Sequence, residues 1–581
     1  MKVLVIGAGA SGLVTAKVLR ERGHEVSIVS DSQRVGGTFE NKSYKNARMV
    51  SSKYLTCFSD FRRPDAEMHM TLNDYVTYLE EYTVHFDLKG IIRYGTTIAS
   101  IREGEMKEYI IQMSDKDGKP WEEKYDAVAV CSGLHNFPRV PQFPGQESFT
   151  GEILHSSDYK DPEILRGKRV LVIGTGETGF DIGYAAATNG AKEVTMSTRH
   201  GFVSVPSAFG EDKPPLDCII MNYGTHYWES EFAQRVGLHW WITTKFTRLG
   251  FLFSTGTTYG FNQWVGKRFN MTWDEGRKHI VNKSARTMPL LSRKAKREAN
   301  WLVRKIYSYW DTAIPEGALD IDLVEGSVSS MQGTTVKYDT AKGDRSVEAD
   351  IVVLCTGYRQ RFPFLFGEGK VGGPSMAEDS HCPSKDDPLP TEHFIVNPDA
   401  PRLAYIGFIR PNVGAIPPMA ELQAMWWCEK MEDKLACKAN TYYKLHESRL
   451  NYGVDYGYYM FALAREIRAV PSLLYWALRR PKIALVCGYG QAHVPIFRLQ
   501  GPFATKEAQE VCANELWQPL MKRPFMMNFL FAFEALCFGI INGVLCALEN
   551  PRSRAVVTLG VGAALLRKEG VRDQLRSFLI K

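Results

Sequence analysis

The N-terminal residues read as a buried strand, a glycine turn, a helix and a second strand. Residues 3–6 form a continuous apolar run, which is typical of a strand buried on both faces. A helix-like segment at 13–22 follows, and a Gly-His turn leads into a second apolar strand at 25–29. The turn before the helix contains three spaced glycines: Gly7, Gly9 and Gly12. A G-x-G-x-x-G loop between strand and helix predicts a dinucleotide site.

Each glycine of this loop has a physical task. Gly7 permits the tight turn, Gly9 lets the backbone approach a pyrophosphate, and Gly12 allows close packing of helix on strand. The N-terminus of the helix favours the phosphate charge. Further along, Gly36 and Gly37 allow a second loop to lie close against a flat ligand such as a flavin.

The same pattern returns in the middle of the chain. A strand at 169–173 precedes a second glycine loop, a helix runs through Ala187, and another strand follows at 193–197. The loop repeats the three glycine positions as Gly174, Gly176 and Gly179. The chain therefore carries two dinucleotide sites.

The residues that end the second strand of each unit differ in charge. Asp31 follows the first unit and suits a ribose diol, whereas Ser197 and Arg199 stand at the end of the second. A guanidinium can pair bidentately with a 2′-phosphate, so the second site should prefer NADPH over NADH. The alternative is that Arg199 is a solvated surface residue. The natural pair of ligands is a resident FAD and an arriving NADPH.

Charge and cysteine content exclude several functions. The formal net charge is +6, and nine basic against four acidic residues from Lys522 onward contribute +5 of it. The nearly neutral remainder argues against nucleic-acid binding. Eleven cysteines form no C-x-x-C pair, which argues against the simplest zinc sites and a dithiol redox centre. We expect no metal site.

Motifs between and after the glycine loops resemble the flavin-containing monooxygenase family. Phe149, Gly151, His155 and Tyr159 match its pattern F-x-G-x-x-x-H-x-x-x-[Y/F]. Baeyer–Villiger enzymes carry tryptophan at the last position, so Tyr159 favours the branch that oxygenates heteroatoms. Further similar segments occur in family order, at 131–135, 355–358, 414–418, 421–423 and 497–502. The chain thus resembles a divergent member of this family over residues 1 to about 515.

The resemblance implies a fold and its organisation. The fold is α/β, with two Rossmann-type dinucleotide-binding domains, the NADPH domain inserted into the FAD domain, and a mainly helical C-terminal region. The expected boundaries are 1–160 and 336–455 for the FAD domain, 161–335 for the NADPH domain with an insertion at about 205–310, and 456–581 for the helical region.

The resemblance also implies a reaction. NADPH reduces FAD, the reduced flavin captures O2 as a hydroperoxide, and a nucleophilic nitrogen or sulfur of a small molecule takes one oxygen atom. Such chemistry needs cofactor-binding residues more than catalytic side chains, so we assign no catalytic residue. The residues expected to bind FAD are Gly7, Gly9, Gly12, Asp31, Gly36, Gly37 and Gln423. Those expected to bind NADPH are Gly174, Gly176, Gly179, Ser197 and Arg199.

Four positions depart from the family pattern. Ser30 stands where the family has Glu, with Asp31 one residue later, while Phe39 replaces Trp and Met425 replaces Arg. Val50 stands where the family has an asparagine, and the resemblance implies that this amide supports the oxygenated flavin and the bound NADP+. Because valine offers no such hydrogen bond, we expect altered coupling between NADPH use and oxygenation.

The C-terminal tail is apolar and basic. Residues 525–548 are mostly apolar but include Glu534, which is costly in lipid, so an interfacial helix is favoured over a spanning one. The alternative is a set of soluble helices covering the FAD domain. No signal-peptide pattern precedes the first strand. We therefore expect an intracellular protein, in the cytoplasm or on the cytoplasmic face of the endoplasmic reticulum membrane.

Three alternative functions stay open. A Baeyer–Villiger monooxygenase is disfavoured by Tyr159, and an NADPH oxidase that releases peroxide is permitted by Val50. A membrane-associated scaffold that binds nucleotides without turnover is disfavoured by the two intact glycine loops. The sequence identifies neither the individual substrate nor the oligomeric state.

Overall fold

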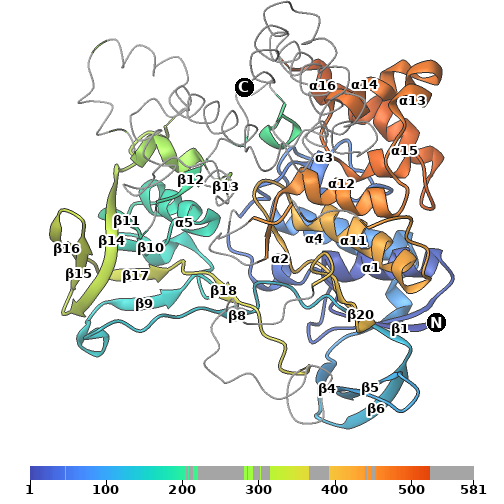
Figure 1. Cartoon of the computed structure of the whole chain (residues 1–581). Helices are drawn as coiled ribbons and strands as arrows, with labels where there is room; N and C mark the ends of the chain where they lie inside the picture. The colour runs from blue at the N-terminus through green and yellow to red at the C-terminus, as the bar shows by residue number, and fades with distance from the viewer. Residues whose placement is uncertain are drawn as a thin grey trace, which may run out of the picture.

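The computed structural model consists of two units that lie side by side (Figure 1). Each unit is built on a sheet whose central strands are parallel. The structure describes residues 1–45, 47–199, 201–204, 207, 214–219, 281–283, 285–291, 293, 301, 314–365, 391–438, 441, 443–445 and 452–523. Most of the expected insertion at 205–310 and the whole apolar segment at 525–548 lie outside this described part.

The first unit is built on a six-stranded sheet. Its strands, in spatial order, are β19 (Val396–Asn397), β20 (Ala400–Tyr405), β7 (Ala127–Val130), β1 (Lys2–Ile6), β2 (Glu25–Val29) and β3 (Ile92–Arg93). All neighbours run parallel except β19 and β20. The strands at the centre are apolar on both faces, as expected for a covered parallel sheet.

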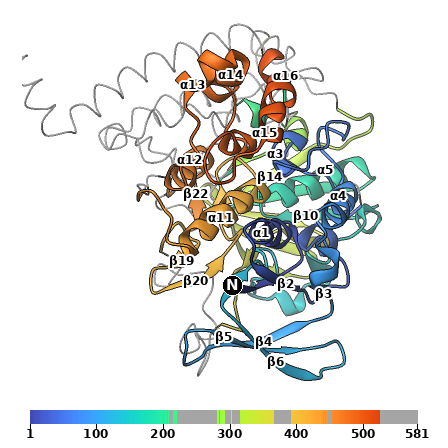
Figure 2. The same cartoon turned by 90° about the vertical axis from the view of Figure 1, so that its right-hand side faces the viewer.

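Alternate residues of β1 enter two different cores. Val3 and Val5 pack with the helices α1 (Ala10–Glu21) and α11 (Ile416–Met431). Leu4 and Ile6 point to the other face. There they meet a three-stranded antiparallel sheet composed of β4 (Thr97–Glu103), β5 (Tyr109–Ser114) and β6 (Pro120–Tyr125). This period of two produces three layers, which Figure 2 shows from the side.

The second unit repeats this construction. Its strands, in spatial order, are β16 (Gly343–Glu348), β15 (Thr335–Thr340), β14 (Ile321–Gln332), β11 (Glu193–Thr198), β10 (Arg169–Ile173), β17 (Ile351–Leu354) and β9 (Glu152–His155). Val170 and Val172 pack toward α5 (Glu177–Thr188), whereas Leu171 packs toward the antiparallel strands β14 to β16. Along the sequence, the second unit comes after β7 and before β20 of the first sheet. The second unit is therefore inserted into the first.

The second sheet extends past the boundaries expected from the sequence, which were 161 and 335. β9 and β17 pair in parallel with one another and β17 pairs with β10, so the sheet runs from residue 152 to residue 354. The reason is that β17 and β7 hold equivalent positions in the two sheets. The apolar strand β17 pairs with β10 just as β7 pairs with β1. Residues 351–354 therefore belong to the second sheet and not to the returning first one.

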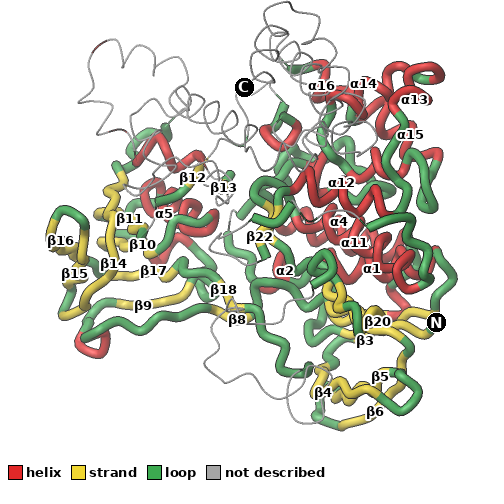
Figure 3. The backbone as a smooth tube through the Cα atoms, viewed as in Figure 1, coloured by secondary structure: helices red, strands yellow, loops and turns green. Residues whose placement is uncertain are grey.

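The remaining helices lie mostly over the first unit (Figure 3). They are α2 (Thr38–Asn41), α3 (Lys53–Thr56), α4 (Leu72–His85), α12 (Tyr456–Glu466), α13 (Leu473–Arg479), α14 (Pro481–Tyr489), α15 (Lys506–Glu510) and α16 (Trp517–Met521). Thr71 and Asp74 form a capping box at the start of α4. Residues 456–521 are thus mainly helical, and the α/β fold with two Rossmann-type units is confirmed.

Short strand pairs connect distant segments. They are β8 (Phe137–Pro138) with β18 (Tyr358–Arg359), β12 (Val203–Ser204) with β13 (Val281–Asn282), and β21 (Arg410–Pro411) with β22 (Gly453–Val454). β8 and β18 lie where the chain passes between the two units (Figure 1). Among the described residues, no helix combines the length and apolar character that a membrane crossing requires.

Candidate functional site

The two glycine loops have the same backbone geometry. Gly7 has φ +111° and Gly174 has φ +118°, a left-handed region that glycine tolerates best. A Cβ on Gly7 would lie 2.6 Å from the carbonyl oxygen of Cys131, and one on Gly174 would lie 2.3 Å from that of Cys355. The carbonyls at the ends of β7 and β17 therefore force the same turn in both units.

The third glycine of each loop lets the helix approach the strand. A Cβ on Gly12 would lie 1.8 Å from the carbonyl oxygen of Gly7, and one on Gly179 would lie 2.2 Å from that of Gly174. Neither glycine lines the two cavities described below. Their task is packing, and they act on a bound nucleotide only through the position of α1 or α5.

Asp31 and Arg199 occupy corresponding positions. The Gly7 N–H donates to the Val29 carbonyl over 2.7 Å, and the Gly174 N–H donates to the Ser197 carbonyl over 3.0 Å. Asp31 and Arg199 each stand two residues beyond that carbonyl, and both are exposed. A carboxylate in the first unit is thus replaced by a guanidinium in the second. This correspondence supports Asp31 as the acidic residue of the first site, although Ser30 holds the position where the family has Glu.

The first cavity has a volume of about 800 Å³ and follows the first glycine loop. Gly7, Gly9, Asp31, Gly36 and Gly37 all line it. Gly9 is the N-cap of α1, which has no side-chain cap and no acidic residue in its first turn, so its N–H groups face no competing carboxylate. An uncapped helix N-terminus within a glycine wall fits the pyrophosphate of FAD.

Gln423 lies behind this cavity and does not line it. Its side chain is fully buried on α11, its Oε1 accepts from the Gly407 N–H over 2.8 Å, and its Nε2 donates to the Tyr459 hydroxyl over 2.8 Å. Gly407 itself lines the cavity. The structure therefore places Gln423 as a support for the wall and not at its surface.

Of the residues expected to bind NADPH, none lines either cavity. Gly174, Gly176 and Gly179 form the second loop, Ser197 is buried at the end of β11, and Arg199 is exposed beside it. Among the described residues, no atom outside the adjacent backbone lies within 4 Å of where a Cβ on Gly176 would be.

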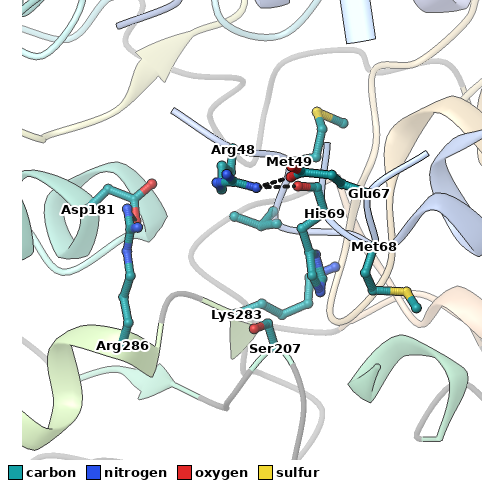
Figure 4. A pocket seen from close by; sticks show the side chains of 10 residues that line it. Arg48, Met49, Glu67, Met68, His69, Asp181, Ser207, Lys283 and Arg286 are labelled. Atoms are coloured by element: carbon teal, nitrogen blue, oxygen red, sulfur yellow. Dashed lines mark hydrogen bonds and ion pairs between the residues drawn. The ribbon is translucent and has the colours of Figure 1, made fainter. Parts of the chain in front are cut away.

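A second cavity, of about 490 Å³, lies between the two units (Figure 4). The first unit contributes Arg48, Met49, Val50, Glu67, Met68 and His69, and the second contributes Asp181, Ser207, Lys283 and Arg286. Met49, Val50 and Lys283 line both cavities, so the two share a wall. Val50 offers no hydrogen bond at this shared wall, as the sequence indicated.

Most charged residues of the second cavity are paired. Arg48 contacts Glu67, and the Arg286 guanidinium lies 3.0 Å from the Asp181 carboxylate. The Tyr44 hydroxyl donates to Asp181 over 2.9 Å, and burial raises the pKa of that carboxyl. Sequence reasoning missed this cavity because its residues come from five separated segments and share no motif.

Of two further departures from the family pattern, Phe39 lines the first cavity and Met425 is buried away from it. Phe39 packs edge-to-face on Tyr75, with ring centroids 4.8 Å apart, and Met425 is fully buried in the main core. His155 is held by the Ser157 hydroxyl at 3.0 Å and the Gly357 carbonyl at 3.1 Å. His155 thus joins β9 to the loop after β17, a structural role between the units.

Comparison with known proteins identifies the family of the chain. The family model described as flavin-binding monooxygenase-like matches residues 1–258 and 313–523. The chain is 32% identical to Monooxygenase PC-14 of Penicillium crustosum over 95% of this chain and 98% of that protein. It is 27% identical to Flavin-containing monooxygenase 2 of Homo sapiens, covering 94% and 99%. Among solved structures, the S-allyl-L-cysteine S-oxygenase of Allium sativum aligns with a TM-score of 0.49 at 18% identity, over 92% and 97% of the two chains.

Proposed function

The chain belongs to the flavin-binding monooxygenase-like family, and from that premise we propose that it oxygenates a nucleophilic nitrogen or sulfur of a small molecule. Its cofactors are FAD and NADPH. Bound FAD supplies the redox chemistry, because it accepts hydride from NADPH and its reduced form reacts with O2. The observation that carries the proposal is a cofactor-sized cavity on the first glycine loop that shares a wall with a smaller cavity between the units.

The proposed tasks of the protein are binding, orientation and exclusion of water. Gly7 and Gly9 let the backbone and the start of α1 approach a pyrophosphate. Gly36 and Gly37 line the same cavity, and the Asp31 carboxylate accepts a hydrogen bond from a ribose hydroxyl. Gly12 and Gln423 support these walls from behind. The second cavity is proposed to receive the substrate, since neither glycine loop contributes to it.

Oxygen transfer is tested with purified holoprotein, NADPH, 18O2 and methyl phenyl sulfide or N,N-dimethylaniline. We expect one 18O atom per product molecule and NADPH consumption that matches product formation. Release of all the electrons as hydrogen peroxide would replace the proposal with the oxidase alternative, which Val50 in the shared wall permits. Lactone formation from cyclohexanone, without sulfide or amine oxidation, would identify a Baeyer–Villiger enzyme instead.

Arg199→Ala is expected to raise KM for NADPH about 10- to 100-fold while changing KM for NADH less than about 3-fold. The reason is that the guanidinium would pair with a 2′-phosphate that only NADPH carries, and a charged hydrogen bond contributes about 1.5–3 kcal/mol. Arg199 is exposed and has no ion-pair partner within the described residues, so folding should be unaffected. Steady-state kinetics with both coenzymes measure the effect, and equal changes in the two KM values would remove the assignment.

Membrane contact of the tail is also proposed, on the basis of its sequence. Removal of residues 524–581 should move the protein from the membrane pellet to the supernatant after cell fractionation. The cut belongs after Arg523, because its guanidinium donates to the carbonyls of Tyr489 and Cys218, each over 2.6 Å. A truncated protein that still sediments with membranes would contradict an anchoring tail.

A further inference from the structure

Lys283 is a buried cation that has no carboxylate partner among the described residues. Its side chain is among the buried polar groups at 5% exposure. Its Nζ donates to the Ser51 hydroxyl over 2.7 Å and to the Gly414 carbonyl over 3.0 Å. Both acceptors are neutral, and no carboxylate of the described residues lies within 4.0 Å of Nζ. An ammonium has three donors, so one N–H is left for another acceptor.

The two carboxylates whose charges act on Lys283 are committed elsewhere. Asp217 accepts from the Ser52 N–H over 2.6 Å and from the Ser52 hydroxyl over 2.7 Å, and Glu177 lies 3.5 Å from the Arg410 guanidinium. Burial lowers the pKa of Lys283, and the fields of Asp217 and Glu177 offset this only in part. A buried ammonium without an ion pair is unfavourable for folding, and groups of this kind cluster at functional sites.

Apart from Lys283, the charged side chains that line the second cavity are balanced by partners of opposite charge. Arg48 and Glu67 pair with one another, as do Arg286 and Asp181. Burial lowers the pKa of His69, which keeps this ring neutral near pH 7. Within the described lining, Lys283 is therefore the charge that no neighbour balances. Figure 4 shows its side chain extending toward His69 from the segment that carries Arg286.

We propose that Lys283 binds an anionic oxygen of the substrate, a carboxylate or an acidic phenol, where the two cavities meet. This inference rests on the proposed monooxygenase function and assigns its substrate class. The shared wall of Met49, Val50 and Lys283 is the place where a ligand in the second cavity meets the cofactor cavity. An anion held there anchors one end of the substrate and leaves the nucleophilic atom to approach the flavin. A cavity of about 490 Å³ has room for a small aromatic acid.

The test is anaerobic binding to the oxidised holoenzyme without NADPH, so that no turnover is involved. The probes are matched pairs of a thioether acid and its primary amide in several sizes, such as 4-(methylthio)benzoate and 4-(methylthio)benzamide. Binding is followed by the change in flavin absorbance and by calorimetry. We expect at least one acid to bind the wild-type protein about 10- to 100-fold more tightly than its amide. Lys283→Met should abolish that ratio while changing the Kd of the amide less than about 3-fold.

Two controls separate this result from a general loss of structure. Lys45→Met removes a nearby exposed cation that pairs with Asp161 and lines neither cavity, and it should preserve the acid-to-amide ratio. The Tm of Lys283→Met should be equal to or above that of the wild type, because an unpaired buried charge is replaced by an apolar side chain.

Three outcomes would overturn the proposal. They are an absence of any acid that binds the wild type better than its amide, an equal loss for acid and amide in Lys283→Met, and weaker retention of FAD or NADP+ with an unchanged ratio. The last outcome would mean that the anion belongs to a cofactor. Oxygenation of neutral methyl phenyl sulfide, measured separately, reports on the proposed function itself, so the two failures are distinguishable.

Discussion

Replacement of Gly12 by alanine is expected to yield protein without FAD and to destabilise the first unit by at least about 3 kcal/mol. The added Cβ would lie 1.8 Å from the Gly7 carbonyl oxygen and 3.0 Å from its carbon. Both atoms belong to the backbone, so no side-chain rotation relieves the clash. Helix α1 would have to move away from β1 by roughly 1.5 Å to restore van der Waals contact. Such a shift would displace the loop that lines the first cavity.

Gly9→Ala is the matched control in the same loop. A Cβ at Gly9 would lie 3.6 Å from the Gly37 Cα, which is an ordinary contact, and the backbone there is extended with φ −83°. Because Gly9 lines the cavity, its alanine variant should fold with a nearly unchanged Tm and bind FAD more weakly. The ratio of flavin to protein absorbance and the Tm measure both effects. A soluble Gly12→Ala protein with the wild-type flavin content would contradict the packing argument.

The glycine loops could be predicted because their signals are local. The expected strand at 25–29 is β2, and the expected strand at 169–173 is β10. The helix expected at 13–22 is α1, whose first turn begins three residues earlier at Ala10. In each case three signals within 30 residues were enough to predict the element: an apolar run, the glycine spacing and a helical period. The difference at Ala10 reflects the loop itself, whose last residues already adopt helical backbone angles.

The division of the chain into domains was harder to predict from the sequence. Residues 351–354 read as an apolar strand, but the sequence alone does not say which sheet such a strand joins. The structure assigns them to the second sheet through pairing with β10 and β9. The choice depends on contacts between residues about 180 positions apart, which no local pattern encodes.

The second cavity could not be predicted for the same reason. Lys283, Asp181 and His69 come from segments that share no spacing, and each alone reads as an ordinary surface or core residue. Gln423 was expected from a segment that resembles the flavin-lining part of the family. The structure places it one layer deeper, on a buried hydrogen-bond chain to Tyr459. Resemblance thus located the segment but not the direction of the side chain.

A buried ionic cluster joins α1 to three distant segments of the chain. Arg498 donates to the Asp60 carboxylate over 2.5 Å and to the Ser59 hydroxyl over 2.8 Å, and Lys17 contacts the same Asp60. Glu421 contacts Ser59, and burial together with the charge of Asp60 raises its pKa to about 7. Arg498 is only 3% exposed. It belongs to the segment 497–502 that resembles the family's C-terminal region, and the cluster shows what that segment holds together.

Arg498→Met is expected to destabilise the protein by about 3–5 kcal/mol, because Asp60 and Glu421 would lose a buried counter-ion that no solvent replaces. The Tm should fall by about 2–4 °C. Arg480→Met is the control, since Arg480 pairs with Glu510 over 3.0 Å with side chains 47% and 62% exposed. Removing that surface pair should cost less than about 1 kcal/mol. Thermal unfolding of both variants with saturating FAD compares the two arginines, and equal shifts would show that the buried cluster contributes no more than a surface ion pair.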